Sequence, residues 1–208
     1  HHGLPEDTVK LLLVGFIAFV AFSLHAQDAP SLNRAGWKEY QAKNFVQALE
    51  LFEKAWTADP SLAVAHYNWA CTAAILYRAQ VCEYLHLRSD IFTHLKRAIE
   101  LKPAYRQKMV KDDDLSSVRG EYQFWILAGK NPSNPAELRD ILTHCRWFGP
   151  KPGTALISRA AFKSDGSMIY ELLYTSEDGS YMGYKPLRAR WSVSGSDILL
   201  IFDTPIEE

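Results

Sequence analysis

The chain has 208 residues, a length that fits one large domain or two small ones. Hydrophobic residues make up 48% of it and charged residues 23%, a composition that excludes disorder throughout the chain. The 23 basic and 24 acidic side chains give a formal charge of −1, so the chain lacks the basic surplus that would hold a polyanion. Nucleic-acid binding is therefore disfavoured, and we expect no nucleic-acid partner.

The N-terminal part contains an unbroken apolar run, LLLVGFIAFVAF at residues 11–22, which follows Lys10. Such a run, a few residues before a small residue such as Ala26, is typical of a secretory signal peptide cleaved after that residue. The run is shorter than the ~20 residues that span a bilayer as a helix. Extended to Ala26, it leaves an uncleaved N-terminal anchor or a peripheral membrane association as the alternative. We predict a signal segment over residues 1–26 and an exported protein, periplasmic or associated with the cell envelope.

Three cysteines follow this segment, at Cys71, Cys82 and Cys145. An odd number in an exported protein permits one disulfide at most and leaves one thiol over. The fold is therefore expected to depend on its hydrophobic core rather than on disulfides.

Residues 31–130 carry the periodicity of amphipathic helices. One helical face is predicted at Phe45, Ala48, Leu49, Phe52, Ala55 and Trp56. The dipeptide Asp59-Pro60 ends this helix, because proline lacks the N–H and forces the residue before it out of the α region. A second copy is predicted at Ile91, Leu95, Ala98 and Ile99, and it ends in the same way at Lys102-Pro103. Another helical stretch precedes each copy, so the pattern predicts helical hairpins.

These hairpins resemble the tetratricopeptide repeat family over residues 31–128. The first copy matches that repeat at Gly36, Tyr40, Phe45, Ala48, Phe52, Ala55 and Pro60, and the second at Tyr67, Asn68, Ala70, Leu95, Ala98 and Pro103. The two prolines are 43 residues apart, nine more than the usual 34. We therefore expect an insertion within residues 79–89. The segment at residues 114–119, with Phe124-Trp125, resembles the part that often closes such arrays.

In this family the first helix of each hairpin lines a groove that binds a segment of a partner protein. The resemblance implies that the groove of this chain is lined by Asn33, Trp37, Gln41, Tyr67 and Cys71. Core packing is the competing interpretation for Trp37 and Tyr67, because large amphipathic rings are favoured in interiors as well as at interfaces. The Lys and Asn pattern that clamps a terminal carboxylate in some members is absent, so such a target is not expected.

A repeat of this kind does not bury its apolar face alone, and about three stacked units are normally needed. The sequence contains two. We therefore expect the helix near residues 116–127, together with the C-terminal part of the chain, to cover the exposed end.

The pattern changes to that of a small β domain over residues 131–208, after a turn-rich linker at residues 129–135. Asp-Gly turns are predicted at residues 164–167 and 177–180, and Met168, Tyr170, Leu172 and Tyr174 alternate between them on one face of a strand. Five or six antiparallel strands in a meander are expected, with Trp147 near the first. This order of turns and strands weakly resembles the small lipocalin-like barrels.

One run has the residue types of a metal site, each four residues after the last: Cys82, His86, Asp90 and His94. On a helix each step of four passes a full turn by ~40°, so the end residues lie ~120° apart and do not reach one ion. A zinc site would need further ligands, for which His66 and Cys71 are candidates. We expect an ordinary helix face here, with no metal and no other cofactor.

The sequence contains no nucleophile motif and no phosphate-binding motif, so we expect no enzymatic activity. It predicts an α+β chain in three parts: the signal segment over residues 1–26, a tetratricopeptide-like domain over 27–130 and a small antiparallel β domain over 131–208. The leading functional hypothesis is an exported, non-catalytic module that binds a peptide or helix of a partner protein. The alternative is a small apolar ligand held by the lipocalin-like β domain.

Overall fold

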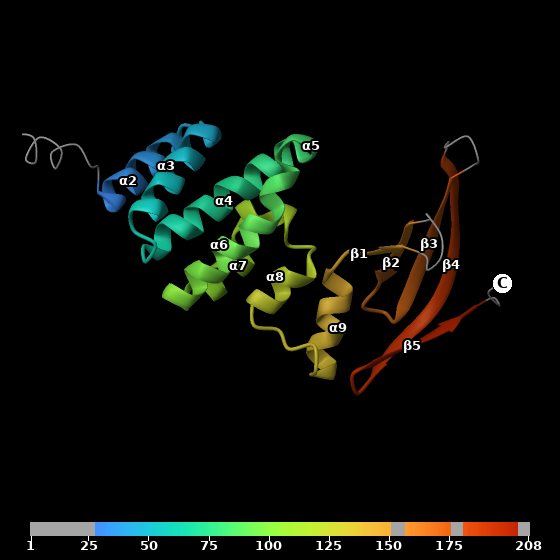
Figure 1. Cartoon of the computed structure of the whole chain (residues 1–208). Helices are drawn as coiled ribbons and strands as arrows, with labels where there is room; N and C mark the ends of the chain where they lie inside the picture. The colour runs from blue at the N-terminus through green and yellow to red at the C-terminus, as the bar shows by residue number, and fades with distance from the viewer. Residues whose placement is uncertain (1–27, 151–156, 176–180, 204–208) are drawn as a thin grey trace, which may run out of the picture.

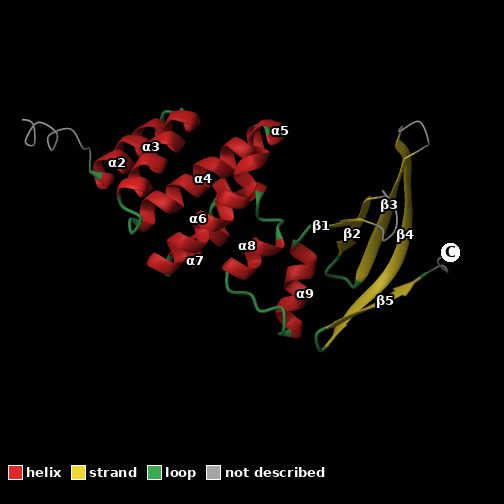
Figure 2. Ribbon diagram, viewed as in Figure 1, coloured by secondary structure: helices red, strands yellow, loops and turns green. Residues whose placement is uncertain are grey.

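The computed structural model describes residues 28–150, 157–175 and 181–203. The signal segment predicted over residues 1–26 lies outside these ranges. Helices occupy one end of the molecule and a five-stranded antiparallel sheet the other (Figure 2), which confirms the α+β class.

The first hairpin pairs α2 (Ala29–Gln41) with α3 (Phe45–Ala58). The Asp28 side chain caps α2 by accepting a hydrogen bond of 2.7 Å from the Ser31 N–H. Gly36 lets the two helices approach closely, because a Cβ at this position would lie 2.8 Å from ring carbons of the fully buried Phe52. The small residue of the predicted repeat pattern is therefore required by the packing of the hairpin.

The second hairpin pairs α4 (Ala63–Ala79) with α6 (Arg88–Leu101), and α4 is the central helix. Nearly every residue of α4 between Ala65 and Leu76 is buried, because α3, α6 and the later 3₁₀ segment η2 (Asp113–Ser117) surround it. Alanines on several of its faces permit this close packing. A helix covered on all sides needs no polar face, which is why α4 is apolar nearly all round.

Both predicted proline stops are confirmed. Asp59 and Lys102 take nearly the same extended conformation, with φ and ψ of −140° and 95° for Asp59 and −143° and 94° for Lys102. Each residue precedes a proline and directly follows the last residue of its helix. Between α4 and α6 the chain forms α5 (Val81–Tyr84) and a 3₁₀ turn, η1 (Leu85–Leu87), within the segment where the insertion was predicted.

After the second hairpin, α7 (Tyr105–Lys111), η2 and α8 (Tyr122–Leu127) close the end of the helical stack. The Ser117 hydroxyl donates a hydrogen bond of 2.9 Å to the carbonyl of Ala74 on α4. Phe124 and Trp125 of α8 are buried in the same core as the two hairpins. This arrangement agrees with the expected covering helix near residues 116–127.

The sequence analysis missed α9 (Pro135–His144), which opens the C-terminal part where only strands were expected. Its start has a clear signal, because Asn134 Oδ1 accepts hydrogen bonds from the N–H groups of Ala136 and Glu137, and Pro135 occupies the first turn. Figure 1 shows α9 between the helical stack and the sheet.

The sheet is a meander in the order β1-β2-β3-β4-β5, with every neighbouring pair antiparallel. The strands are β1 (Trp147–Pro150), β2 (Ile157–Phe162), β3 (Ser167–Thr175), β4 (Tyr181–Ser194) and β5 (Asp197–Phe202). Gly166 has a φ of 84°, which is the positive value that the predicted Asp-Gly turn requires. Five strands form in the described residues, and Trp147 is the first residue of β1, so the expectation of five or six strands with Trp147 near the first is confirmed. The second predicted turn, at residues 177–180, lies outside the described residues.

The apolar face of α9 joins the two ends of the molecule. Leu138 and Leu142 pack with Met168 and Trp191 of the sheet. Ile141, the neighbour of Leu142, and Cys145, which directly follows the helix, belong to the core of the helical stack. Trp147 contacts both cores. The predicted contact between the halves is therefore present, and α9 is the element that makes it.

Candidate functional site

A pocket of about 210 Å³ lies where α2, α4, α7 and the start of η2 meet. Its lining combines aromatic rings with polar and charged groups: Trp37, Tyr40, Tyr67, Asn68, Cys71, Lys108, Asp112 and Asp114. Helical spacing explains how these residues converge, because Trp37 and Tyr40 are three residues apart on α2 and Tyr67 and Cys71 four apart on α4. We call this the α2–α4 pocket.

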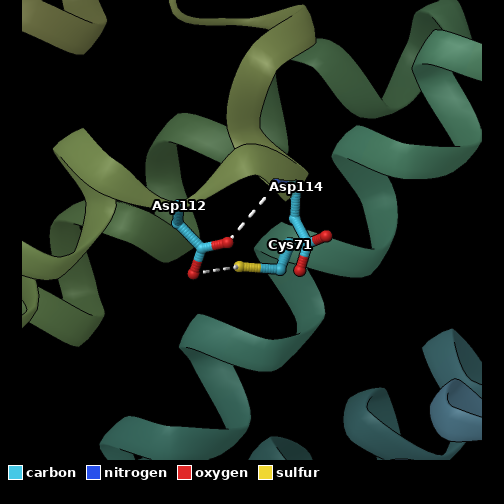
Figure 3. A group of neighbouring side chains, drawn as sticks. All are labelled: Cys71, Asp112 and Asp114. Atoms are coloured by element: carbon cyan, nitrogen blue, oxygen red, sulfur yellow. Dashed lines mark hydrogen bonds between the residues drawn. The ribbon is translucent and has the colours of Figure 1, made fainter.

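One wall of the α2–α4 pocket is built around Asp112, which lies between α7 and η2. Its Oδ2 accepts a hydrogen bond of 2.8 Å from the hydroxyl of Tyr67, and the Sγ of Cys71 lies 3.9 Å from the same oxygen. Its Oδ1 accepts from the N–H of Asp114 at 3.3 Å and so caps the 3₁₀ segment (Figure 3). Asp112 is thus fixed by contacts to two different segments.

Asp114 is the second carboxylate of the pocket, and its Oδ2 accepts a hydrogen bond from the hydroxyl of Tyr40 at 2.5 Å. Burial raises the pKa of this carboxyl above its ordinary value of 3.8, while the hydrogen bond from Tyr40 opposes the shift and the charge of Asp112 adds to it. Burial, together with the Asp114 carboxylate, also raises the pKa of Tyr40. The pocket therefore holds two half-buried carboxylates beside neutral phenols.

Aromatic rings form the remaining surface. Trp37 and Tyr40 are stacked, with ring centroids 4.9 Å apart and planes inclined by 9°. Trp37 is 45% exposed, so one side of this pair is open to solvent. Tyr67 stacks on Tyr105 at 4.4 Å, and the ammonium of Lys108 lies 4.3 Å from the centroid of the Tyr67 ring.

The groups in the α2–α4 pocket do not form an activated nucleophile. Burial raises the pKa of the Cys71 thiol well above its ordinary value, and the nearby carboxylates of Asp112 and Asp114 add to this shift. The thiol is therefore protonated at neutral pH, which makes it a poor nucleophile and a poor ligand for soft metals. Potential ligand atoms of Cys71, Asp112 and Asp114 do lie within 4.8 Å of one another. Because the thiol stays protonated, the carboxylates of Asp112 and Asp114 are better suited to accept hydrogen bonds than to hold a metal ion together with Cys71.

Three of the five predicted groove residues line the α2–α4 pocket. Trp37 is half-exposed, whereas Tyr67 and Cys71 are buried and reach the pocket with their polar ends. Asn33 lies beside it, and its Oδ1 accepts a hydrogen bond of 3.1 Å from the amide of the lining residue Asn68. Gln41 is exposed at the end of α2 and is not part of the lining.

Five lining residues of the pocket were not predicted from the sequence: Tyr40, Asn68, Lys108, Asp112 and Asp114. Lys108, Asp112 and Asp114 lie some 40 residues after Tyr67, so no local spacing connects them to it. The acidic run at residues 112–114 was a usable signal, because three consecutive carboxylates directly follow a helix there.

The residues considered for a metal site are divided among three elements. Cys82 lies on α5, His86 on η1, and Asp90 and His94 on α6, so they do not share one helix face. His66, named as a further candidate, does meet His94, with their Nδ1 atoms 2.9 Å apart. That distance is a hydrogen bond between the two rings.

A larger and more open cleft of about 430 Å³ lies between α6 and α8. Phe92, Tyr122 and Ile126 contribute to a lining that is mainly apolar. The smaller α2–α4 pocket is therefore the better candidate, because specificity depends on a few polar groups placed among apolar ones.

Within the described ranges, no helix is both long and apolar enough to cross a bilayer. Neither a scan against protein-family models nor a search of curated proteins finds a match to this chain.

Proposed function

We propose that the chain is an exported, non-catalytic interaction protein whose tetratricopeptide-like hairpins bind a segment of a partner protein. One side chain of that segment enters the α2–α4 pocket. Export is supported by the apolar run at residues 11–22 alone, as a sequence pattern.

The observation that carries this proposal is the combination of an exposed aromatic ring, that of Trp37, with fixed polar groups in one pocket. Trp37 is 45% exposed although it belongs to an otherwise well-packed hairpin. Exposed tryptophan at the edge of a pocket is typical of residues that contribute most to binding a protein partner. The polar groups behind it, Tyr67 and Asp112, are hydrogen-bonded to each other and so need no reorganisation when a partner binds.

The size of the pocket supports a single side chain as its occupant. At about 210 Å³ it is smaller than the ~300–1,000 Å³ of ordinary small-molecule sites. The protonated state of Cys71 supports binding rather than covalent chemistry, since a thiol with a raised pKa is not activated.

Site-specific crosslinking in the native host tests this function. A photoreactive residue replaces Gln41, which is exposed on α2 one turn beyond Trp37, in the otherwise native chain and in a Trp37→Ala variant. Truncating an anchor residue costs ~2 kcal/mol or more in binding, which is a loss of about 30-fold in affinity. We expect a specific crosslinked partner that the Trp37→Ala variant loses.

The matched control places the same photoreactive residue at Glu53, which is exposed on α3. We expect this position to crosslink equally with and without Trp37. A partner recovered from the Gln41 position at the same yield in the Trp37→Ala variant contradicts the proposal.

A further inference from the structure

We infer that the partner side chain bound in the α2–α4 pocket is an arginine, held between the ring of Trp37 and the carboxylate of Asp114. This inference rests on the proposed function and specifies its partner. The pocket geometry, its charge and its exposed ring each favour a flat cation.

The carboxylates supply negative charge that the described residues do not neutralise by a direct ion pair. Neither Asp112 nor Asp114 has a basic group within salt-bridge distance among the residues that the structure describes. Arg119 pairs instead with Asp113, at 3.9 Å, and donates to the backbone carbonyl of Asp112. Arg78 and Lys108 act on Asp114 through their charge, but neither forms an ion pair with it. A cation in direct contact with the carboxylates is therefore still favoured in the pocket.

Lys108 is the one basic residue in the pocket lining, and it does not take the position of the inferred ligand. Its ammonium lies over the ring of Tyr67, 4.3 Å from the centroid, on the side formed by α4 and α7. The opposite side, formed by Trp37 and Tyr40 of α2, has no cation over either ring among the described residues. The pocket thus has one aromatic surface with a cation and one without.

The exposed ring of Trp37 favours a flat cation over other occupants. Tryptophan offers the strongest cation–π surface, and a guanidinium stacks on it while its N–H groups donate to a carboxylate in nearly the same plane. Within the described part of the chain, Asp114 accepts only the hydrogen bond from Tyr40, at Oδ2, so its Oδ1 remains available to accept one. An ammonium is a point charge and uses only part of this arrangement.

Other side-chain classes fit less well. An acidic side chain would meet the carboxylates of Asp112 and Asp114 at short range, and like charges repel. An apolar side chain would remove water from both carboxylates without replacing the lost hydrogen bonds, which is costly. A cationic side chain avoids both penalties.

Calorimetric titration of the full chain with a hexa-arginine peptide tests the inference. Hexa-citrulline is the reference ligand, because it keeps the shape of arginine but carries no charge. The variants are Asp114→Asn and Trp37→Ala. Asp113→Asn is the matched control, because it removes the same charge at the neighbouring position. The side chain of Asp113 is 99% exposed.

We expect hexa-arginine to bind and hexa-citrulline to bind at least about tenfold more weakly, the factor that corresponds to one charge-assisted hydrogen bond. Asp114→Asn and Trp37→Ala each reduce the affinity for hexa-arginine about tenfold, whereas Asp113→Asn changes it less than about twofold. Equal losses in Asp113→Asn and Asp114→Asn overturn the inference, because they show attraction by net charge alone. Equal affinity for the two peptides, or no binding of hexa-arginine, overturns it as well.

Failure of this inference is distinguishable from failure of the proposed function. If the Trp37-dependent crosslink forms in the host while hexa-arginine does not bind, the interaction stands and its anchor is not arginine. If the crosslink does not depend on Trp37, the proposed function itself is wrong.

Discussion

The buried His66 of α4 pairs with the half-buried His94 of α6, with their Nδ1 atoms 2.9 Å apart. The Nε2 of His66 lies 3.1 Å from the carbonyl oxygen of Pro60, to which only an N–H can donate. The Nδ1 of a neutral His66 therefore accepts a hydrogen bond from the Nδ1–H of His94. The rings of Trp56 and Trp69 lie against His94, with centroids 5.0 and 4.2 Å away. Protonation of His66 at Nδ1 would remove this acceptor, so the hydrogen bond between the rings requires an uncharged His66.

This pair predicts that the helical stack loses stability in mild acid. Burial lowers the pKa of His66, and burial together with the charge of His66 lowers the pKa of His94 to about 4. The unfolded chain binds protons below pH 6.5, the ordinary value, whereas the folded chain does not until lower pH. The resulting stability is complete above about pH 6.5 and is lost as the pH falls towards 4. Asp59 and Asp90, which favour protonation, and Arg97, which opposes it, are the charged neighbours.

Denaturant unfolding at several pH values, compared between the native chain and a His94→Gln variant, measures this effect. We expect a shallower loss of unfolding free energy between pH 6.5 and 4 in the variant, because one of the two coupled protonations is removed. Carboxylates that titrate in the same range contribute equally in both chains, so their contribution cancels in the comparison. His86→Gln is the control, since His86 is exposed, and it leaves the slope unchanged. Parallel curves for the native chain and His94→Gln contradict the prediction.

The contact of Gly36 with Phe52 predicts a penalty for an otherwise favourable substitution. In a helix interior Ala is normally ~1 kcal/mol better than Gly. At Gly36 the new Cβ would lie 2.8 Å from the Phe52 ring, and overpacking of this kind costs ~1–3 kcal/mol. We expect Gly36→Ala to lower the unfolding free energy, and Phe52→Leu in the same chain to restore part of the loss. A double-mutant cycle measures this coupling, and additive effects would exclude the steric explanation.

Sequence analysis placed the helices and strands well because each signal it used is local. Periodic apolar residues, prolines after helix ends and Asp-Gly turns are all contained within a few neighbouring residues. The helix α9 was missed although Asn134-Pro135 marks its start, because the turn-rich composition around it was interpreted as a linker. Here a helix cap and a loop use the same residue types.

The candidate site was only half predictable for a different reason. The resemblance to the tetratricopeptide repeat implied that Trp37 and Tyr67 line one groove, but a repeat pattern does not give the depth of a side chain. Tyr67 is 1% exposed because Asp112 and Tyr105 cover it, and both come from the segment that follows the second hairpin. No spacing along the chain connects α4 with that segment.

The two hydrophobic cores that meet along α9 predict that the helical stack and the sheet unfold together. Ile141 is fully buried in the core of the helical stack, and Leu142 is 2% exposed in the core of the sheet. Truncating either to Ala costs ~2–5 kcal/mol. We expect each variant to lower the unfolding free energy while unfolding remains a single transition, seen by both circular dichroism and tryptophan fluorescence. Asp140→Ala is the control, because its exposed pair with Lys130 contributes ~1 kcal/mol or less. Separate transitions for helices and sheet would refute this role of α9.

The different burial of Trp37 and Tyr67 predicts that the first mainly affects binding and the second mainly affects folding. Tyr67→Phe removes the donor to Asp112 and leaves a half-buried carboxylate with one hydrogen bond fewer, which costs ~1–3 kcal/mol of unfolding free energy. Trp37→Ala removes a ring that is 45% exposed and stacked on Tyr40, and costs about 1 kcal/mol or less. Urea unfolding measures both changes. The reverse order would mean that Trp37 is a core residue, and its loss could then no longer be used as a test of partner binding.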